Sequence, residues 1–127
     1  MKILAVDDSV DITDALEMSF EMIGYDFTTS NSGKEAVSLI MKNAYDVILL
    51  DFAMPGFSGL DVIRELESMT NVPDLNIIMF TASAIEPSAI EPSEINQLNE
   101  KGIKGIIRKP IHVNELEKEI NKILSKE

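Results

Sequence analysis

The sequence predicts one α/β domain built on a parallel β-sheet with helices on both faces. Short unbroken apolar runs, such as 3–6 and 46–50, are typical of strands that are buried on both sides. Between these runs, apolar residues recur every three or four positions, which is the pattern of amphipathic helices. Strict alternation of five strands with five helices indicates parallel strands joined by helical crossovers.

The first half of the chain contains two strand–helix units and a third strand. The first helix ends at Gly24, which is placed as a C-terminal glycine. Residues 25–29 are more polar than the other strands, which favours an edge position. The expected elements are a strand at 3–6, a helix marked by Ile12, Leu16, Phe20 and Ile23, a strand at 25–29, a turn at 31–33, a helix marked by Ala36, Leu39 and Ile40, and a central strand at 46–50.

The second half continues the same alternation. A loop at 54–59 leads to the third helix, which is interrupted by Val72-Pro73 because proline breaks helices. A long polar connection precedes a short fourth helix near 93–101. The expected elements are a helix marked by Leu60, Ile63 and Leu66, a strand at 75–80, the fourth helix, a strand at 104–107, and a helix marked by Leu116, Ile120, Ile123 and Leu124.

Composition excludes several classes of function. The 127 residues are expected to form one domain over 1–127, and 45% hydrophobic residues suit a folded globule. The formal net charge of -11 disfavours direct nucleic-acid binding and contact with an anionic membrane. No apolar run is long enough to insert into a bilayer. The absence of cysteine fits a reducing compartment, so a cytoplasmic location is expected.

Polar side chains follow four of the apolar runs, where each expected strand ends. Asp7 and Asp8 follow the first strand, Asp51 the third and Thr81 the fourth, and Lys109 lies just beyond the fifth. Ligand sites in open parallel sheets form at the carboxyl ends of the strands, so these five side chains are expected to surround one site. Three carboxylates, one hydroxyl and one amine can hold a divalent cation and a phosphoryl group together.

These residues also carry a resemblance to a known family. Asp-Asp at 7–8, Asp51 with Met-Pro-Gly after it, Thr-Ala at 81–82 and Lys-Pro at 109–110 together resemble the receiver domain of two-component response regulators, of the single-domain chemotaxis type. The resemblance covers essentially the whole chain. It implies a flavodoxin-like, doubly wound five-stranded sheet in the order 2-1-3-4-5 with five helices.

The resemblance implies a phosphoacceptor and a metal site. Asp51 would accept the phosphoryl group and form an acyl phosphate. Asp8 would bind Mg²⁺ directly and Asp7 would hold it through water, while Asp51 and the backbone carbonyl of Ala53 would be the other protein ligands. Mg²⁺ suits such a site because it prefers a few carboxylates, several waters and phosphate oxygens.

The resemblance also implies roles for the hydroxyl and the amine. Thr81 would donate its hydroxyl to the phosphoryl oxygens, and Lys109 would pair with them as a point charge. The family holds the peptide between Lys109 and Pro110 cis, which aims the lysine inward. The implied partners are a histidine kinase or phosphotransfer protein and an output protein whose identity the sequence does not give. The module would phosphorylate and dephosphorylate itself but would turn over no external substrate.

Simpler interpretations stand beside these roles. Asp8 or Ser9 could cap the first helix, Thr81 could bond only to backbone, and Lys109 could lie along the surface. Two other functions are also open. One is a pseudo-receiver that binds partners without phosphorylation. The other is a Mg²⁺-dependent aspartyl phosphatase, which is disfavoured because such enzymes usually place a second Asp where this chain has Ala53.

The chain departs from the family pattern at several positions. Ile106 stands where the family often has an aromatic that turns inward, so a rotating aromatic cannot operate there. The interval from Thr81 to Lys109 is longer than usual, with the excess at 85–94, which is either a harmless loop extension or an altered partner surface. Ala53 and Ser83 offer little to hold a hydrolytic water, which predicts a long-lived phosphorylated state.

Overall fold

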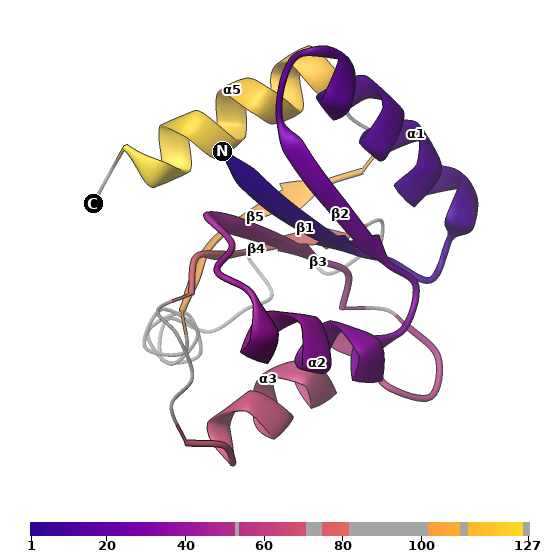
Figure 1. Ribbon diagram of the computed structural model, residues 1–127, viewed down its shortest axis with the longest axis vertical. Helices are drawn as coiled ribbons and strands as arrows, with labels where there is room; N and C mark the ends of the chain where they lie inside the picture. Colours follow the sequence, from indigo (N-terminus) through magenta and orange to yellow (C-terminus); the bar gives the residue numbers. More distant parts are fainter. Residues whose placement is uncertain (53, 71–74, 82–101, 110–111, 126–127) are drawn as a thin grey trace.

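A five-stranded parallel sheet forms the centre of the computed structural model, in the order β2-β1-β3-β4-β5 (Figure 1). This order and the parallel pairing confirm the predicted doubly wound sheet, with the polar strand at an edge and the most apolar strand in the middle. The structure describes residues 1–52, 54–70, 75–81, 102–109 and 112–125. The strands are β1 (Lys2–Val6), β2 (Asp26–Ser30), β3 (Val47–Leu50), β4 (Ile77–Thr81) and β5 (Ile103–Arg108).

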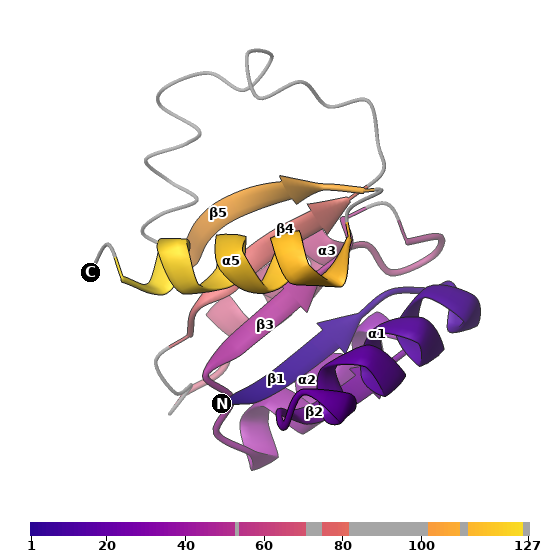
Figure 2. The same cartoon turned by 90° about the horizontal axis from the view of Figure 1, so that it is seen from above.

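Helices cover both faces of the sheet. Figure 2 shows α1 and α5 in front of the strands and α2 and α3 behind them. Four of the five expected helices lie among the described residues, and the one expected near 93–101 lies outside them. The described helices are α1 (Val10–Met22), α2 (Gly33–Lys42), α3 (Gly59–Glu67) and α5 (Val113–Leu124).

Two separate cores form because successive side chains of a strand point to opposite faces. In β1, Ile3 and Ala5 pack with α1 and α5, whereas Leu4 and Val6 pack with α2 and α3. All four residues of β3 are at most 1% exposed. Strand β3 is therefore an unbroken apolar run, because both of its faces are covered.

Serine side chains begin three of the helices. Ser9 accepts a hydrogen bond from the Ile12 amide and is the N-cap of α1, so of the two residues proposed for this role it is Ser9 that caps. Ser32 caps α2, and Ser58 forms a capping box with Asp61 at the start of α3. Helix α1 is thereby fixed to begin directly after the paired aspartates.

Helix α3 buries Ile63 and Leu66 as predicted, but not Leu60. Leu60 was expected on the apolar face but is 40% exposed, whereas Val62 and Ile63 are buried. Gly59 packs instead against the segment that directly follows β3, where a Cβ at residue 59 would be 2.8 Å from the backbone oxygen of Asp51. The start of the helix therefore approaches Asp51 and Phe52 more closely than a side chain at residue 59 would permit.

Candidate functional site

The carboxylates of Asp7 and Asp51 are held side by side by continued strand pairing. The amide of Asp51 donates to the carbonyl of Val6 at 2.9 Å, and the amide of Asp7 donates to the carbonyl of Ser30 at 3.0 Å. Each aspartate is thus the first residue beyond its strand and is still bonded to the neighbouring strand. Asp7 is 3% exposed and Asp51 is 6% exposed. The pairing fixes both backbones at the carboxyl edge of the sheet.

Asp8 completes a cluster of three carboxylates. One oxygen from each of Asp7, Asp8 and Asp51 lies within 4.8 Å of the others, and Asp8 is exposed whereas its neighbours are buried. Carboxylates at this separation repel one another, and a cation between them relieves the repulsion. Hard oxygen ligands that open to solvent on one side fit Mg²⁺, which keeps several of its waters.

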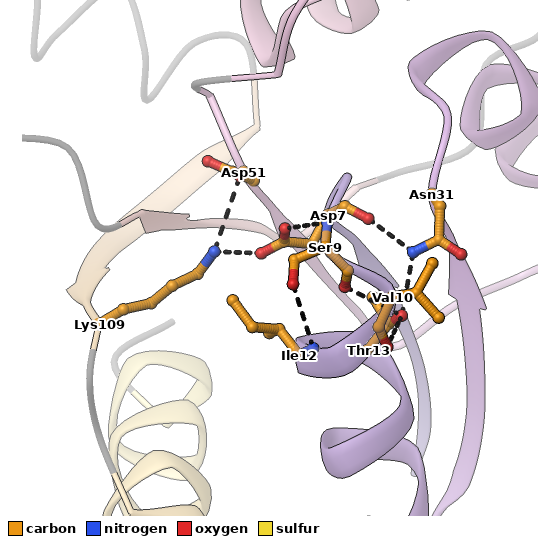
Figure 3. A network of polar contacts seen from close by, with 8 residues as sticks. All are labelled: Asp7, Ser9, Val10, Ile12, Thr13, Asn31, Asp51 and Lys109. Atoms are coloured by element: carbon orange, nitrogen blue, oxygen red, sulfur yellow. Dashed lines mark hydrogen bonds and ion pairs between the residues drawn. The ribbon is translucent and has the colours of Figure 1, made fainter.

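Lys109 supplies a positive charge to this cluster from beyond β5. Its ammonium donates a hydrogen bond to Asp7 Oδ2 and lies 3.6 Å from Asp51 Oδ2, with the side chain only 9% exposed (Figure 3). The ammonium also lies 5.1 Å from the centre of the Phe80 ring. The structure therefore directs Lys109 into the site, and the interpretation as a surface lysine is wrong.

The other predicted site residues are only partly described. Thr81 is the last residue of β4 and pairs with Arg108 of β5, which places its backbone at the same edge of the sheet. Its side chain lies outside what the structure describes, as do Ala53 and Pro110. The roles inferred for these residues stay predictions.

A further network of polar side chains lies behind Asp7 and was not predicted. Asn31 Nδ2 donates to the backbone oxygen of Asp7 at 2.8 Å and to Thr13 Oγ1 at 3.0 Å (Figure 3). The amide of Ser9 donates to Asp7 Oδ1 at 2.9 Å. The sequence placed residue 31 only in a turn, although it is a polar residue that directly follows a strand, as the other site residues do.

The fold and site together define an α/β protein with a doubly wound parallel sheet. At the carboxyl ends of its strands lies a cluster of three carboxylates, one of which is paired with a lysine. A family model described as the response regulator receiver domain matches residues 3–121. The chain belongs to this family, which supports the predicted resemblance and a role in phosphorylation-controlled signalling.

Individual relatives agree with this assignment. The response regulator SaeR of Staphylococcus aureus is 35% identical over 124 residues, which are 98% of this chain and 50% of SaeR. The chain thus spans about half the length of the curated relatives that it matches. Two solved structures cover nearly all of both chains. TrrA of Thermotoga maritima, in complex with Mg(2+)-BeF, has a TM-score of 0.74 at 31% identity and covers 97% of this chain and 99% of TrrA. Chemotaxis protein CheY4 of Vibrio cholerae has a TM-score of 0.73 at 27% identity and covers 96% of this chain and 97% of CheY4.

Proposed function

We propose that Asp51 accepts a phosphoryl group from a phosphohistidine on a kinase or phosphotransfer protein, in a reaction that uses Mg²⁺. The observation that carries this proposal is the position of the Asp51 carboxylate. It is buried, lies within 4.8 Å of two other carboxylates, and is 3.6 Å from the Lys109 ammonium. An aspartate with a purely structural role at a strand end would not require two further carboxylates and an ammonium beside it.

The transfer conserves atoms and charge without a further reactant. A carboxylate oxygen of Asp51 forms a bond to phosphorus while the bond from phosphorus to the imidazole nitrogen breaks, and the imidazole leaves with the electron pair. Asp7 and Asp8 would hold Mg²⁺, with the Ala53 carbonyl as a further ligand. An ion held there would supply positive charge that neutralises the transferring group.

Lys109 and Thr81 would serve the phosphorylated state. The Lys109 ammonium is bonded to Asp7 and lies beside Asp51, so a short movement would bring it to a phosphoryl oxygen on Asp51. The hydroxyl of Thr81 would donate to another. Such charge-assisted bonds are the means by which a phosphoryl group pulls on the segments that follow β4 and β5.

The output is proposed to be a changed binding surface rather than a chemical product. The chain would modify only itself, would act in the cytoplasm, and would bind an output protein whose identity depends on the phosphorylated surface. Among the described residues, no helix is both long enough and apolar enough to cross a bilayer. The net charge of -11 continues to disfavour direct contact with nucleic acid.

A pseudo-receiver is the main alternative, and phosphorylation itself separates the two. Incubation with acetyl phosphate and Mg²⁺ should add one phosphoryl group by mass, and a chelator should prevent the addition. Asp51→Asn should abolish it. Asp46→Asn is the matched control. Asp46 lies at the amino end of β3, whereas Asp51 lies at its carboxyl end, and the Asp46 carboxylate accepts a hydrogen bond from the backbone amide of Lys2. Addition to Asp51→Asn at the wild-type level would refute the proposal.

A further inference from the structure

We infer that Asn31 is a positioning residue that fixes Asp8 for the cation, an inference that rests on the proposed function. Asn31 directly follows β2, and within the described part of the chain its side-chain amide makes no hydrogen bond to a carboxylate oxygen of the site. Its amide nitrogen donates instead to the backbone oxygen of Asp7 at 2.8 Å and to Thr13 Oγ1 at 3.0 Å. Its effect on the cation would therefore be exerted through Asp8.

The orientation of the Asn31 amide follows from its partners. A backbone oxygen can only accept, so the atom that faces Asp7 must be the nitrogen. The second hydrogen of that nitrogen reaches Thr13 Oγ1, which leaves the threonine hydroxyl to donate. Its acceptors are the carbonyls of Val10 at 3.1 Å and Ser9 at 3.3 Å. Each polar atom in this chain of bonds has the partner that its chemistry requires.

Thr13 anchors the amide rigidly. It is 0% exposed in the first turns of α1, so its hydroxyl cannot turn to water for a partner. Through this contact Asn31 links the end of β2 to α1 as well as to β1 (Figure 3). The first three elements of the chain are therefore joined at one side chain.

Asp8 lies between two peptide groups that this network immobilises. The peptide before it is held at the Asp7 oxygen by Asn31. The peptide after it is held at the Ser9 amide, which donates to Asp7 Oδ1 at 2.9 Å. Asp8 itself is exposed, so few side-chain contacts restrain it. The direction in which its carboxylate leaves the backbone is therefore set by the two neighbouring peptides.

Fixing a ligand before the cation arrives strengthens binding because less freedom is lost on binding. Partners that orient metal ligands in this way typically contribute about 10- to 100-fold to metal affinity. Asn31 restrains one of the two peptides beside Asp8, so we expect the lower end of that range, about 10-fold. Substitution of Asn31 by alanine should leave the three carboxylates and their charge in place.

The test compares Asn31→Ala with a matched control. Asn76→Ala removes the same type of bond, from an asparagine amide to an aspartate carbonyl, at the opposite edge of the sheet, where Asn76 donates to Asp46 at 3.1 Å. Mg²⁺ is titrated into each protein by calorimetry, and its dissociation constant is obtained without any phosphodonor. We expect about 10-fold weaker binding for Asn31→Ala and wild-type binding for Asn76→Ala.

A merely structural role for Asn31 predicts a different result. In that case both variants would lose stability to denaturant, and neither would change in Mg²⁺ affinity. Wild-type Mg²⁺ affinity in a folded Asn31→Ala protein overturns the inference.

A second pair of variants tests the anchor. Thr13→Val removes the hydroxyl and nearly preserves the shape, so Asn31 keeps only its bond to Asp7. Thr13→Ser keeps the hydroxyl and loses a buried methyl group. We expect weaker Mg²⁺ binding in Thr13→Val and near-normal affinity in Thr13→Ser, although both lose some stability. Equal affinity in these two variants would overturn the role of the Thr13 contact.

Failure of the inference is distinguishable from failure of the proposed function. If wild-type protein shows no saturable Mg²⁺ binding, the metal site of the proposed function is refuted, and the role of Asn31 is refuted with it. If wild type and Asn31→Ala bind Mg²⁺ equally and both accept a phosphoryl group on Asp51, only the role of Asn31 is refuted.

Discussion

The ammonium of Lys109 is hydrogen-bonded to the carboxylate of Asp7, not to that of Asp51, from which it is 3.6 Å away. Both groups are nearly buried, so little solvent screens their interaction. Lys109 thereby serves as an internal counter-ion to a carboxylate of the cluster. A divalent cation that enters the cluster has to compete with this charge.

Replacing Lys109 should therefore strengthen Mg²⁺ binding. Lys109→Met keeps the length of the side chain but removes the charge, so the three carboxylates lose their counter-ion and attract the cation more strongly. We expect the Mg²⁺ dissociation constant to fall severalfold by calorimetry. Lys104→Met removes an exposed charge from β5 and is the control. If both variants bind Mg²⁺ equally, competition by Lys109 is not significant.

The close contact at Gly59 predicts a stability loss with a defined cause. In Gly59→Ala the new Cβ would meet the Asp51 oxygen at 2.8 Å and a Phe52 ring carbon at 2.6 Å. The expected cost in unfolding free energy is about 1–3 kcal/mol, because the backbone cannot yield freely. Alanine favours helices by about 1 kcal/mol over glycine, so a net loss shows that the contact dominates.

Leu60→Ala is the comparison for that experiment. Leu60 neighbours Gly59 but is 40% exposed. Its substitution should change the unfolding free energy by no more than about 0.5 kcal/mol. Urea denaturation of both variants measures the difference. A larger loss from Leu60→Ala than from Gly59→Ala would contradict the buried face assigned to α3.

The environments of the two tyrosines should make the folded state less stable at high pH. A hydrogen bond to Glu117, followed by burial and the charge of Glu117, raises the pKa of Tyr25 above 10.0. Burial raises the pKa of Tyr45 above 10.0 as well. The folded state thus favours the protonated phenols, so their stabilisation is complete below pH 10 and is lost as the pH rises through the folded pKa values.

Absorbance of tyrosinate checks this directly. The native protein should titrate at a higher pH than the protein in denaturant. Glu117→Gln should lower the pKa of Tyr25, because it removes the charge that opposes ionisation, and should leave Tyr45 unchanged. Tyr25→Phe and Tyr45→Phe assign the two transitions. A native titration that coincides with the denatured one would contradict the prediction.

The phosphorylated state should be long-lived because of Ala53. Hydrolysis needs a water held in line with phosphorus, and family members with fast hydrolysis use a polar side chain two residues after the phosphoacceptor. Ala53 offers none. Positioning of this kind is worth up to about 10²-fold in rate, so Ala53→Asn should speed the loss of the phosphoryl group. Decay at the wild-type rate, followed by mass, would show that another feature sets the lifetime.

Much of the fold was predictable because the sheet is covered on both faces. Unbroken apolar runs such as Val47–Leu50 have one explanation in a chain with this alternation, and the polar β2 was correctly placed at an edge. The error at Leu60 has a physical source. A helix buries residues three and four apart, so a short apolar pattern fits several adjacent faces. The close approach of Gly59 to Asp51 and Phe52 selects one of these faces.

The site was predictable only in part. Strand ends located Asp7, Asp8, Asp51 and Lys109, but the inward direction of Lys109 was inferred from the family resemblance. The network of Asn31 was missed because its bonds join residues 18 and 24 positions apart. Such bonds exist only after β2 has paired with β1, and no local pattern encodes them.

The division of the interior into two cores has a consequence for how the protein tolerates change. Phe20 belongs to the core beneath α1 and α5, and Ile63 belongs to the core beneath α2 and α3, with the sheet between them. Residues without shared neighbours usually contribute additively to stability. Each layer can therefore be repacked without compensation in the other, and substitutions on the helices of one layer are free to accumulate while the second layer still supports the strand ends.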